Sequence, residues 1–221
     1  TGLNNVAAGF KPFFGSAAVT GSSNAVVGNY ALYVNTTGTN NTGIGQEIFQ
    51  GNTTGNSNTA VGSNALRSNT TASNNTAVGY QAGYANTTGD FLTASGFSAL
   101  TTNTTGVRNA GFGAYALSAN TTGGYNTALG MFALSGNTTA SNNTAVGYQA
   151  AYSNTTAVAN SAFGMYSLKS NTTGDNNTAI GFEALLDNTT GALNVAVGLG
   201  ALHENTTASN NTAVGTNSLY S

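Results

Sequence analysis

The tripeptide Asn-Thr-Thr occurs eleven times in this chain, at a constant spacing of 17 residues. A short period without insertions or deletions is typical of a solenoid, in which each repeat forms one coil that stacks on its neighbours. The chain has 221 residues, which is thirteen times 17. The period therefore predicts about 13 stacked coils.

We number the repeat from position 1, the Asn of Asn-Thr-Thr, to position 17. Position 11 is Gly in all twelve repeats that align, and position 4 is Gly or Ala, which indicates two tight corners in each coil. The apolar stretches between them, at positions 8–10 and 12–15, are too short for helices, and the first is rich in Thr, Val and Ile. We therefore predict an all-β fold: a parallel β-solenoid (β-roll) with a 17-residue period, with short strands in both stretches.

Large apolar residues recur at position 10, as in Val78, and at position 15, as in Leu66, so we expect these two positions to fill a narrow interior. Positions 9 and 14 are almost always Ala. Two buried side chains per coil contribute about 1.5–3 kcal/mol each, which is little against the entropy lost by 17 ordered residues. Because rows of Ala allow a neighbouring chain to approach closely, we expect a homo-oligomer.

Position 7 is Asn in eleven of the twelve repeats, with Leu92 as the exception. Stacked asparagines of this kind predict a ladder in which side-chain amides hydrogen-bond between coils, and the same holds for position 1.

The repeats occupy residues 18–221, as twelve units of which the first is degenerate. Residues 1–17 fit the pattern only after a shift of about two residues, so we expect a degenerate N-terminal coil or docking segment there. Its apolar run, residues 10–14, is expected to cap the first coil or to contact an adjacent subunit. Neither end of the pattern has an obvious polar capping repeat, so we expect part of a longer protein or a subunit that stacks end to end into a filament.

Composition argues against several classes of function. Only 5% of the residues are charged and the formal net charge is −2, so a basic surface for nucleic acid is absent. No run of 18 apolar residues occurs, so we expect no membrane insertion. Cysteine is absent, the six acidic residues are scattered, and the only histidine, His203, is expected to be a solvated surface residue. We therefore expect no enzyme, no metal site and no cofactor.

The string NNTAVGYQA, at residues 74–82 and again at 142–150, resembles the head repeats of trimeric autotransporter adhesins, which are also similar to repeats in bacteriophage tail fibres. The resemblance spans positions 6–15 of nearly every coil, although the adhesin coil is usually shorter. It implies a parallel β-roll, association of three chains, and a spacer, surface coat or adhesive head of an extracellular fibre at a cell or virion surface. A cell-surface or glycan receptor is the partner that such a head implies, and half-exposed Tyr side chains are expected to stack on sugars or to cover a seam between chains.

Asn-Thr-Thr is also an acceptor sequence for N-linked glycan, which gives an alternative function as a densely glycosylated structural filament. Five further acceptor sequences begin at position 6, at Asn40, Asn74, Asn142, Asn176 and Asn210. Ice binding is a third possibility, but it needs paired Thr columns two residues apart, and Thr at positions 2 and 3 does not give them. The Asn-Thr-Thr candidates for N-glycosylation are Asn35, Asn52, Asn69, Asn86, Asn103, Asn120, Asn137, Asn154, Asn171, Asn188 and Asn205.

Overall fold

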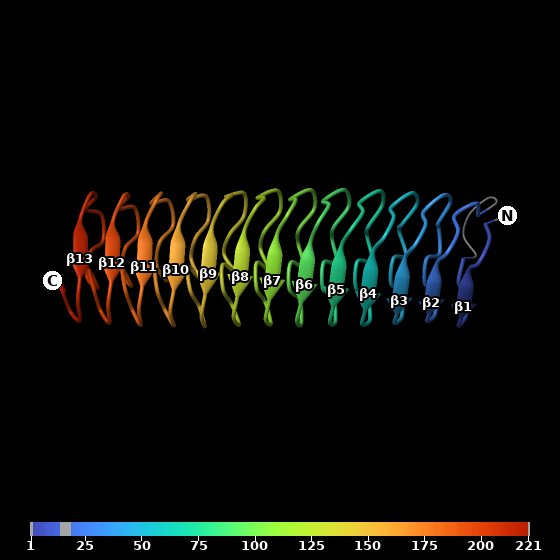
Figure 1. Ribbon diagram of the computed structural model, residues 1–221, viewed down its shortest axis with the longest axis horizontal. Coiled ribbons are helices and arrows are strands. Elements are labelled where there is room, and N and C mark those ends of the chain that lie inside the picture. The colour runs from blue at the N-terminus through green and yellow to red at the C-terminus, as the bar shows by residue number, and fades with distance from the viewer. Residues whose placement is uncertain (1, 14–18, 221) are drawn as a thin grey trace. The chain divides into compact units, whose positions relative to one another are not determined.

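The computed structural model describes residues 2–13 and 19–220. The chain divides into two compact units, residues 1–109 and residues 110–221. Each unit is a parallel β-solenoid with one three-residue strand in every coil and no helix among the described residues (Figure 1). The predicted fold class and the period are therefore confirmed.

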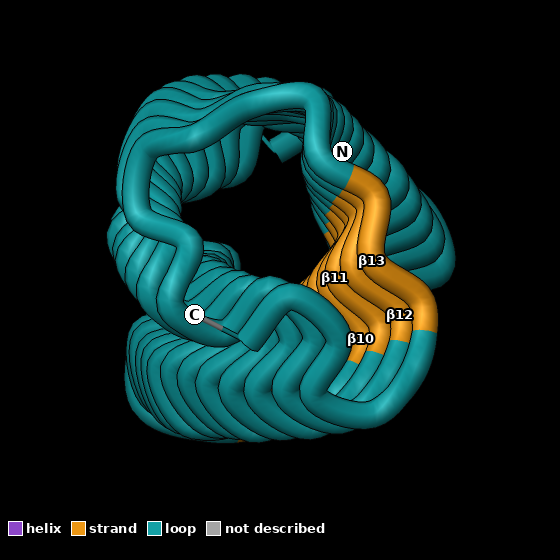
Figure 2. Tube along the Cα trace, turned by 90° about the vertical axis from the view of Figure 1, so that its left-hand side faces the viewer, coloured by secondary structure: helices purple, strands orange, loops and turns teal. Residues whose placement is uncertain are grey.

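The strands pair in parallel with their neighbours in the chain within each unit. The first unit contains β1 (Val6–Ala8), β2 (Ala25–Val27), β3 (Thr42–Ile44), β4 (Thr59–Val61), β5 (Thr76–Val78) and β6 (Thr93–Ser95). The second unit contains β7 (Ala110–Phe112), β8 (Thr127–Leu129), β9 (Thr144–Val146), β10 (Ser161–Phe163), β11 (Thr178–Ile180), β12 (Val195–Val197) and β13 (Thr212–Val214). Figure 2 shows β10 to β13 lying one behind another, with the loops of successive coils on the same path.

The register between neighbouring strands is 17 residues, as in the pairing of Thr59 with Thr76. The first pair differs, because Val6 pairs with Ala25, which is 19 residues along the chain. This difference confirms the two-residue shift inferred for the N-terminal segment.

Only positions 8–10 form strands, so the prediction of a second strand at positions 12–15 is wrong. These positions form turns instead. The physical reason lies in the backbone: positions 13 and 15 have positive φ, as in Tyr115 (φ 59°) and Leu117 (φ 52°). A left-handed residue at every second position is incompatible with an extended strand.

The interior is lined by positions 9, 14 and 15, as Ala145, Ala150 and Leu134 illustrate, each with no exposed surface. The prediction that position 10 fills the interior is wrong, since Val27 is 49% exposed and Ile44 56% exposed. Side chains alternate along a strand, so the buried Ala at position 9 forces positions 8 and 10 outward. The rows of Ala are therefore inside the coil, where they cannot contact a neighbouring chain.

Position 11 needs glycine for two reasons. Gly147 has φ 135°, and a Cβ atom added there would lie 2.5 Å from the carbonyl oxygen of Gly164 in the next coil. Both observations confirm the predicted corner at this position.

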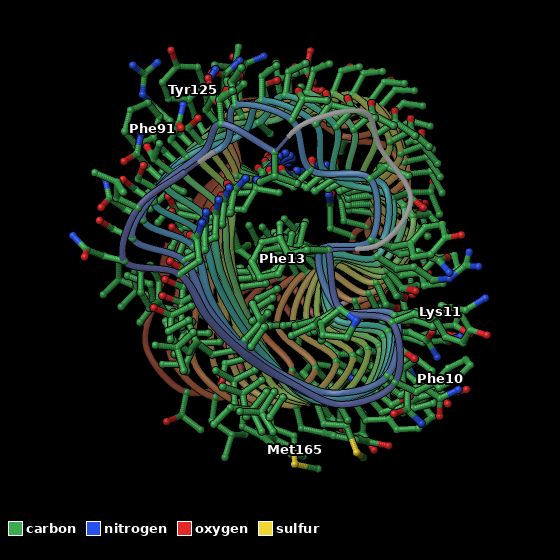
Figure 3. All side chains as sticks on the ribbon, turned by 90° about the vertical axis from the view of Figure 1, so that its right-hand side faces the viewer. Phe10, Lys11, Phe13, Phe91, Tyr125 and Met165 are labelled. Carbon is green, nitrogen blue, oxygen red and sulfur yellow. The ribbon has the colours of Figure 1, made fainter. Side chains whose placement is uncertain are left out.

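The N-terminal segment forms a coil that hydrogen-bonds to the next one. The backbone N–H of Tyr30 donates to the carbonyl of Phe10 at 2.9 Å, and that of Phe13 donates to the carbonyl of Ala31 at 3.3 Å. In Figure 3 the Phe13 ring points into the interior, whereas Phe10 and Lys11 point outward. Phe14, at the end of the predicted capping run, lies outside the described residues, and contact of this segment with another subunit stays a prediction.

Candidate functional site

The asparagines of position 7 form a hydrogen-bonded ladder, which is continuous in the second unit and interrupted at Leu92 in the first. In the second unit the Asn143 amide Oδ1 accepts the backbone N–H of Asn160 at 2.9 Å, and the Asn143 Nδ2 donates to the carbonyl of Ala157 at 2.9 Å. In the first unit Nδ2 of Asn41 also donates to Oδ1 of Asn24 at 3.1 Å. The predicted ladder is confirmed, and it joins side chains to the backbone of the next coil as well as to one another.

The asparagines of position 1 form a second ladder. Nδ2 of Asn154 donates both to Oδ1 of Asn137 at 2.9 Å and to the carbonyl of Ala157 at 3.0 Å. Both N–H groups of this amide are therefore used, and neither side chain has any exposed surface. The same arrangement recurs at Asn171 and Asn188.

This second ladder contains the candidate N-glycosylation residues. Ten of the eleven are fully buried, and Asn205 is partly exposed. A sugar on Nδ2 would have to displace an interior hydrogen bond, so the folded coil has no room for a glycan at the buried ten. Glycosylation of the protein stays a prediction. A row of N-linked sugars on these ten side chains, however, does not fit the folded coil. The buried candidates are Asn35, Asn52, Asn69, Asn86, Asn103, Asn120, Asn137, Asn154, Asn171 and Asn188.

The asparagines of position 6 lie on the outside of the corner before each strand. Asn74 and Asn142 are exposed, with φ of 61° and 64°. Asn tolerates this left-handed backbone better than most residues, which accounts for its frequent presence here.

The outward face of the strands carries one column rich in Thr and one column of apolar residues, and it is free of charge. Positions 8, 10 and 12 carry no charged residue in any of the twelve coils from residue 25 to residue 216. Position 8 is mostly Thr and position 10 is mostly Val, Ile, Leu or Phe, so the paired Thr columns that ice binding requires are not formed on this face. Because two residues span at most about 7 Å, the columns at positions 10 and 12 adjoin each other.

We call the outward large apolar side chains at positions 10 and 12 of the second unit the apolar stripe. They are between 40% and 70% exposed. Figure 3 shows one of them, Met165, pointing away from the solenoid. In the first unit, position 12 is polar in the first three of the twelve coils, with Asn29, Gln46 and Ser63, so the outward apolar surface is narrower there. The stripe consists of Phe112, Leu129, Met131, Phe163, Met165, Ile180, Phe182, Leu199 and Val214.

Aromatic side chains of successive coils contact one another on the surface. The rings of Tyr115 and Phe132 stack with centroids 5.1 Å apart and planes 2° apart, and those of Tyr80 and Phe97 stack at 5.3 Å. Each pair supplies a flat face, and the role of the Tyr side chains in binding sugars or a partner stays a prediction.

Charged groups are few in this chain. His203 is not the solvated residue expected from the sequence, because its side chain is only 14% exposed. It stacks on Tyr220 with ring centroids 4.6 Å apart, and its Nε2 lies 3.6 Å from the Glu183 carboxylate. No cluster of three or more His, Cys, Asp or Glu residues suited to a metal ion occurs among the residues that the structure describes.

The ion pair between Arg67 Nε and Glu47 Oε2, at 2.8 Å, joins side chains of neighbouring coils. Burial lowers the pKa of Arg67, but the hydrogen bond to Glu47 and the charges of Glu47 and Tyr84 together raise it above its ordinary value. The guanidinium thus stays charged and serves as a surface cross-link. Because water still reaches both side chains, which are 33% and 26% exposed, the pair contributes little to stability.

A cavity of about 220 Å³ is lined by the inward-facing residues of the last two coils. None of the residues that line it is charged. Its lining residues are Leu202, Asn205, Ala208, Asn211 and Leu219.

No known protein family, curated protein or solved structure matches this chain. In its described part there is no helix that is long and apolar enough to span a membrane. The class that the geometry defines is therefore a tandem-repeat parallel β-solenoid with two internal asparagine ladders, without assignment to the adhesin heads that its repeats resemble.

Proposed function

We propose that this chain is a non-enzymatic structural segment of an extracellular fibre, acting as a spacer, surface coat or adhesive head. It works as a homo-oligomer whose chains associate side by side at a cell or virion surface. The observation that carries the proposal is the apolar stripe, together with the absence of charged residues at positions 8, 10 and 12.

The size of the stripe supports association. Its nine side chains are each at least 40% exposed. With roughly 170 Å² for a large apolar side chain, they expose about 700 Å² in total. This area exceeds the patch of about 300–600 Å² found on a typical monomer and approaches the roughly 800 Å² that each partner buries in a stable interface.

The repeat itself supports side-by-side packing. Outward side chains recur once per coil, so two copies of the second unit, which share the same period, can match coil by coil. The charge-free face also removes the like-charge repulsion that identical chains otherwise experience. A second copy of this chain is therefore the partner that the stripe fits best.

The two ladders support a mechanical role. Within each unit, neighbouring coils are joined by backbone hydrogen bonds and by buried amide hydrogen bonds, as at Asn143 and Asn154. Buried and fully hydrogen-bonded amides fix the register between coils, because a shift by one residue would leave them unpaired. A protein built in this way keeps surface features at constant spacing, which suits a spacer or an adhesive head.

The alternative of a densely N-glycosylated filament has less support, because ten of its eleven acceptor asparagines are buried. Ice binding has less support as well, since the strand face combines one Thr column with an apolar column.

The test replaces four stripe residues on two coils, in a variant that combines Leu129→Thr, Met131→Thr, Ile180→Thr and Phe182→Thr. These side chains are 41–49% exposed, so the change removes outward apolar surface without opening the core. We expect the native mass of the unaltered protein, measured by light scattering or sedimentation, to be a multiple of the chain mass. The variant should have the mass of one chain.

The matched control replaces exposed apolar residues outside the stripe, Val158→Thr and Leu193→Thr, which are 36% and 56% exposed. The control should keep the native mass of the unaltered protein. A monomeric unaltered protein, or a stripe variant with unchanged native mass, would refute side-by-side association. A native mass of three chains would agree with the trimer implied by the resemblance.

A further inference from the structure

The second Thr of each Asn-Thr-Thr, at position 3, forms a column of exposed side chains, which we call the threonine column. None of its hydroxyls has a hydrogen-bond partner among the residues that the structure describes. The column consists of Thr37, Thr54, Thr71, Thr88, Thr105, Thr122, Thr139, Thr156, Thr173, Thr190 and Thr207.

The fold explains which residues occupy positions 1, 2 and 4, which flank this column in the sequence. Position 1 is a buried ladder asparagine. At position 2, the hydroxyl Oγ1 of Thr138 donates to the carbonyl of Thr155 in the next coil at 3.1 Å, and Thr155 repeats this contact with Thr172 at 3.0 Å. Position 4 holds only Gly or Ala and is buried in every coil except the last, where Ala208 is exposed. Position 3 contributes only its backbone N–H, which any residue except Pro supplies.

Other outward positions show that the coils have diverged where the fold allows it. Position 8, which is a strand position that favours Thr, holds Ala25, Ala110, Ser161 and Val195 in four of its twelve copies. Position 3 is an exposed bend whose side chain makes no hydrogen bond in the part of the chain described, yet it is Thr in all eleven copies. The constancy of position 3 is therefore not explained by folding, and the free hydroxyl is the feature that all copies share.

We propose that the threonine column is a set of acceptors for O-linked sugar. In this reaction the Thr Oγ1 attacks the anomeric carbon of a sugar that is activated by a nucleoside diphosphate or a lipid phosphate. The new bond joins Oγ1 to that carbon, the bond from the carbon to the phosphate oxygen breaks, and the hydroxyl proton passes to a base of the transferase. The activated sugar and the transferase come from the cell.

The surface chemistry of the chain favours this modification. With 5% charged residues and an exposed apolar stripe, the chain has few charges to keep its copies apart in water. Sugars on the loop before each strand would solvate that part of the surface and leave the apolar stripe as the place where chains meet. The inference does not depend on the proposed oligomer, because acceptor chemistry and native mass are measured separately.

The position of the sugar within one tripeptide tests the proposal. Cleavage of the native protein after Arg67 and Arg108 releases residues 68–108, which contain three Asn-Thr-Thr copies. We expect fragmentation mass spectrometry to locate sugars on Thr71, Thr88 and Thr105, and alkaline β-elimination to remove them. Position 2 threonines in the same peptide should be unmodified, because their hydroxyls are engaged.

The other possible outcomes each refute the proposal. A peptide 68–108 without sugar would show that the column is unmodified. Sugar on Asn69, or on the exposed Asn74, would show N-linked chemistry instead, and sugar on position 2 would show that hydroxyl availability does not select the site.

Two variants expressed in the cells that make the protein complete the test. Combined replacement of Thr71→Val, Thr88→Val and Thr105→Val should remove all sugar from residues 68–108. The control, Thr76→Val with Thr93→Val, changes strand threonines in the same peptide and should leave the sugar unchanged. Sugar that persists in the first variant, or disappears from the control, would overturn the proposal.

Discussion

At the scale of the residue, the stability of this protein depends on buried amides. Each ladder asparagine offers two donors and an acceptor, and the coil supplies partners for them. The break at Leu92 shows what the ladder provides: Leu92 still donates its backbone N–H to Oδ1 of Asn75 at 2.7 Å, but the buried Nδ2 of Asn75 has no partner in the part of the chain described. A buried donor without a partner costs about 1–3 kcal/mol, so this coil boundary should be weaker than its neighbours.

We expect Asn143→Ala to lower the free energy of unfolding by about 2–4 kcal/mol. The change leaves the backbone N–H of Asn160 and the carbonyl of Ala157 without their side-chain partners, and both groups are buried. Urea unfolding followed by far-UV circular dichroism measures the loss.

The neighbouring residue supplies the control. Asn142→Ser alters an exposed residue with φ 64°, and Ser57 occupies the same repeat position with φ 57° in another coil. This variant should unfold within about 0.5 kcal/mol of the unaltered protein. Equal effects of the two substitutions would mean that the ladder does not stabilise the fold.

At the scale of the element, the sequence predicted the coil, the corners and the ladders, but it did not predict which side of the strand is buried. The period fixed the stacking, and Gly at position 11 marked a corner that the φ of Gly147 confirms. Position 10 was assigned to the interior because its residues are large and apolar. The small residue at position 9, which is Ala in nine of the twelve coils, is the better signal, because a narrow interior favours a small side chain.

The second strand was mispredicted for a related reason. Positions 12–15 are apolar, and a short apolar run predicts a strand unless the backbone is known. The positive φ of Leu117 and Tyr115 has no signature in sequence, since Leu and Tyr are uncommon in that conformation. Packing of the Leu side chain into the interior overrides the local preference.

Interior volume is shared between positions 9 and 14 of one coil, which gives a prediction for β3. Gly43 stands at position 9, where nine of the twelve coils have Ala, and Ile48 stands at position 14. A Cβ atom added to Gly43 would overlap Cδ1 of Ile48. Gly43→Ala alone should cost about 1–3 kcal/mol by overpacking, and Ile48→Ala alone about 2–4 kcal/mol by leaving a cavity.

The double variant restores the Ala pair seen at Ala60 and Ala65, so it should cost at least about 1 kcal/mol less than the sum of the single changes. Urea unfolding of all four proteins measures this coupling. As a control, Gly43→Ala combined with Leu100→Ala should be additive, because the two positions lie three coils apart, roughly 14 Å. Additive costs for the Gly43 and Ile48 pair would contradict shared packing.

At the scale of the whole molecule, charge contributes little and apolar surface contributes much. The chain has four Lys or Arg residues and six Asp or Glu residues, none of them at positions 8, 10 or 12. An assembly held by ion pairs would weaken as salt shortens the range of electrostatic attraction, from about 10 Å at 0.1 M to about 3 Å at 1 M. An assembly held by the apolar stripe has no such interaction to lose.

We therefore expect the native mass to be maintained, or to increase, when NaCl is raised from about 0.1 M to about 1 M, and sulfate to promote association further. Light scattering at fixed protein concentration measures this response. The four-residue stripe variant should remain a single chain in NaCl throughout the range, which separates specific packing from general salting out. A native mass that falls toward one chain as NaCl rises would place charged residues such as Arg67 or Asp175 at the interface, and would contradict the assignment of the interface to the apolar stripe.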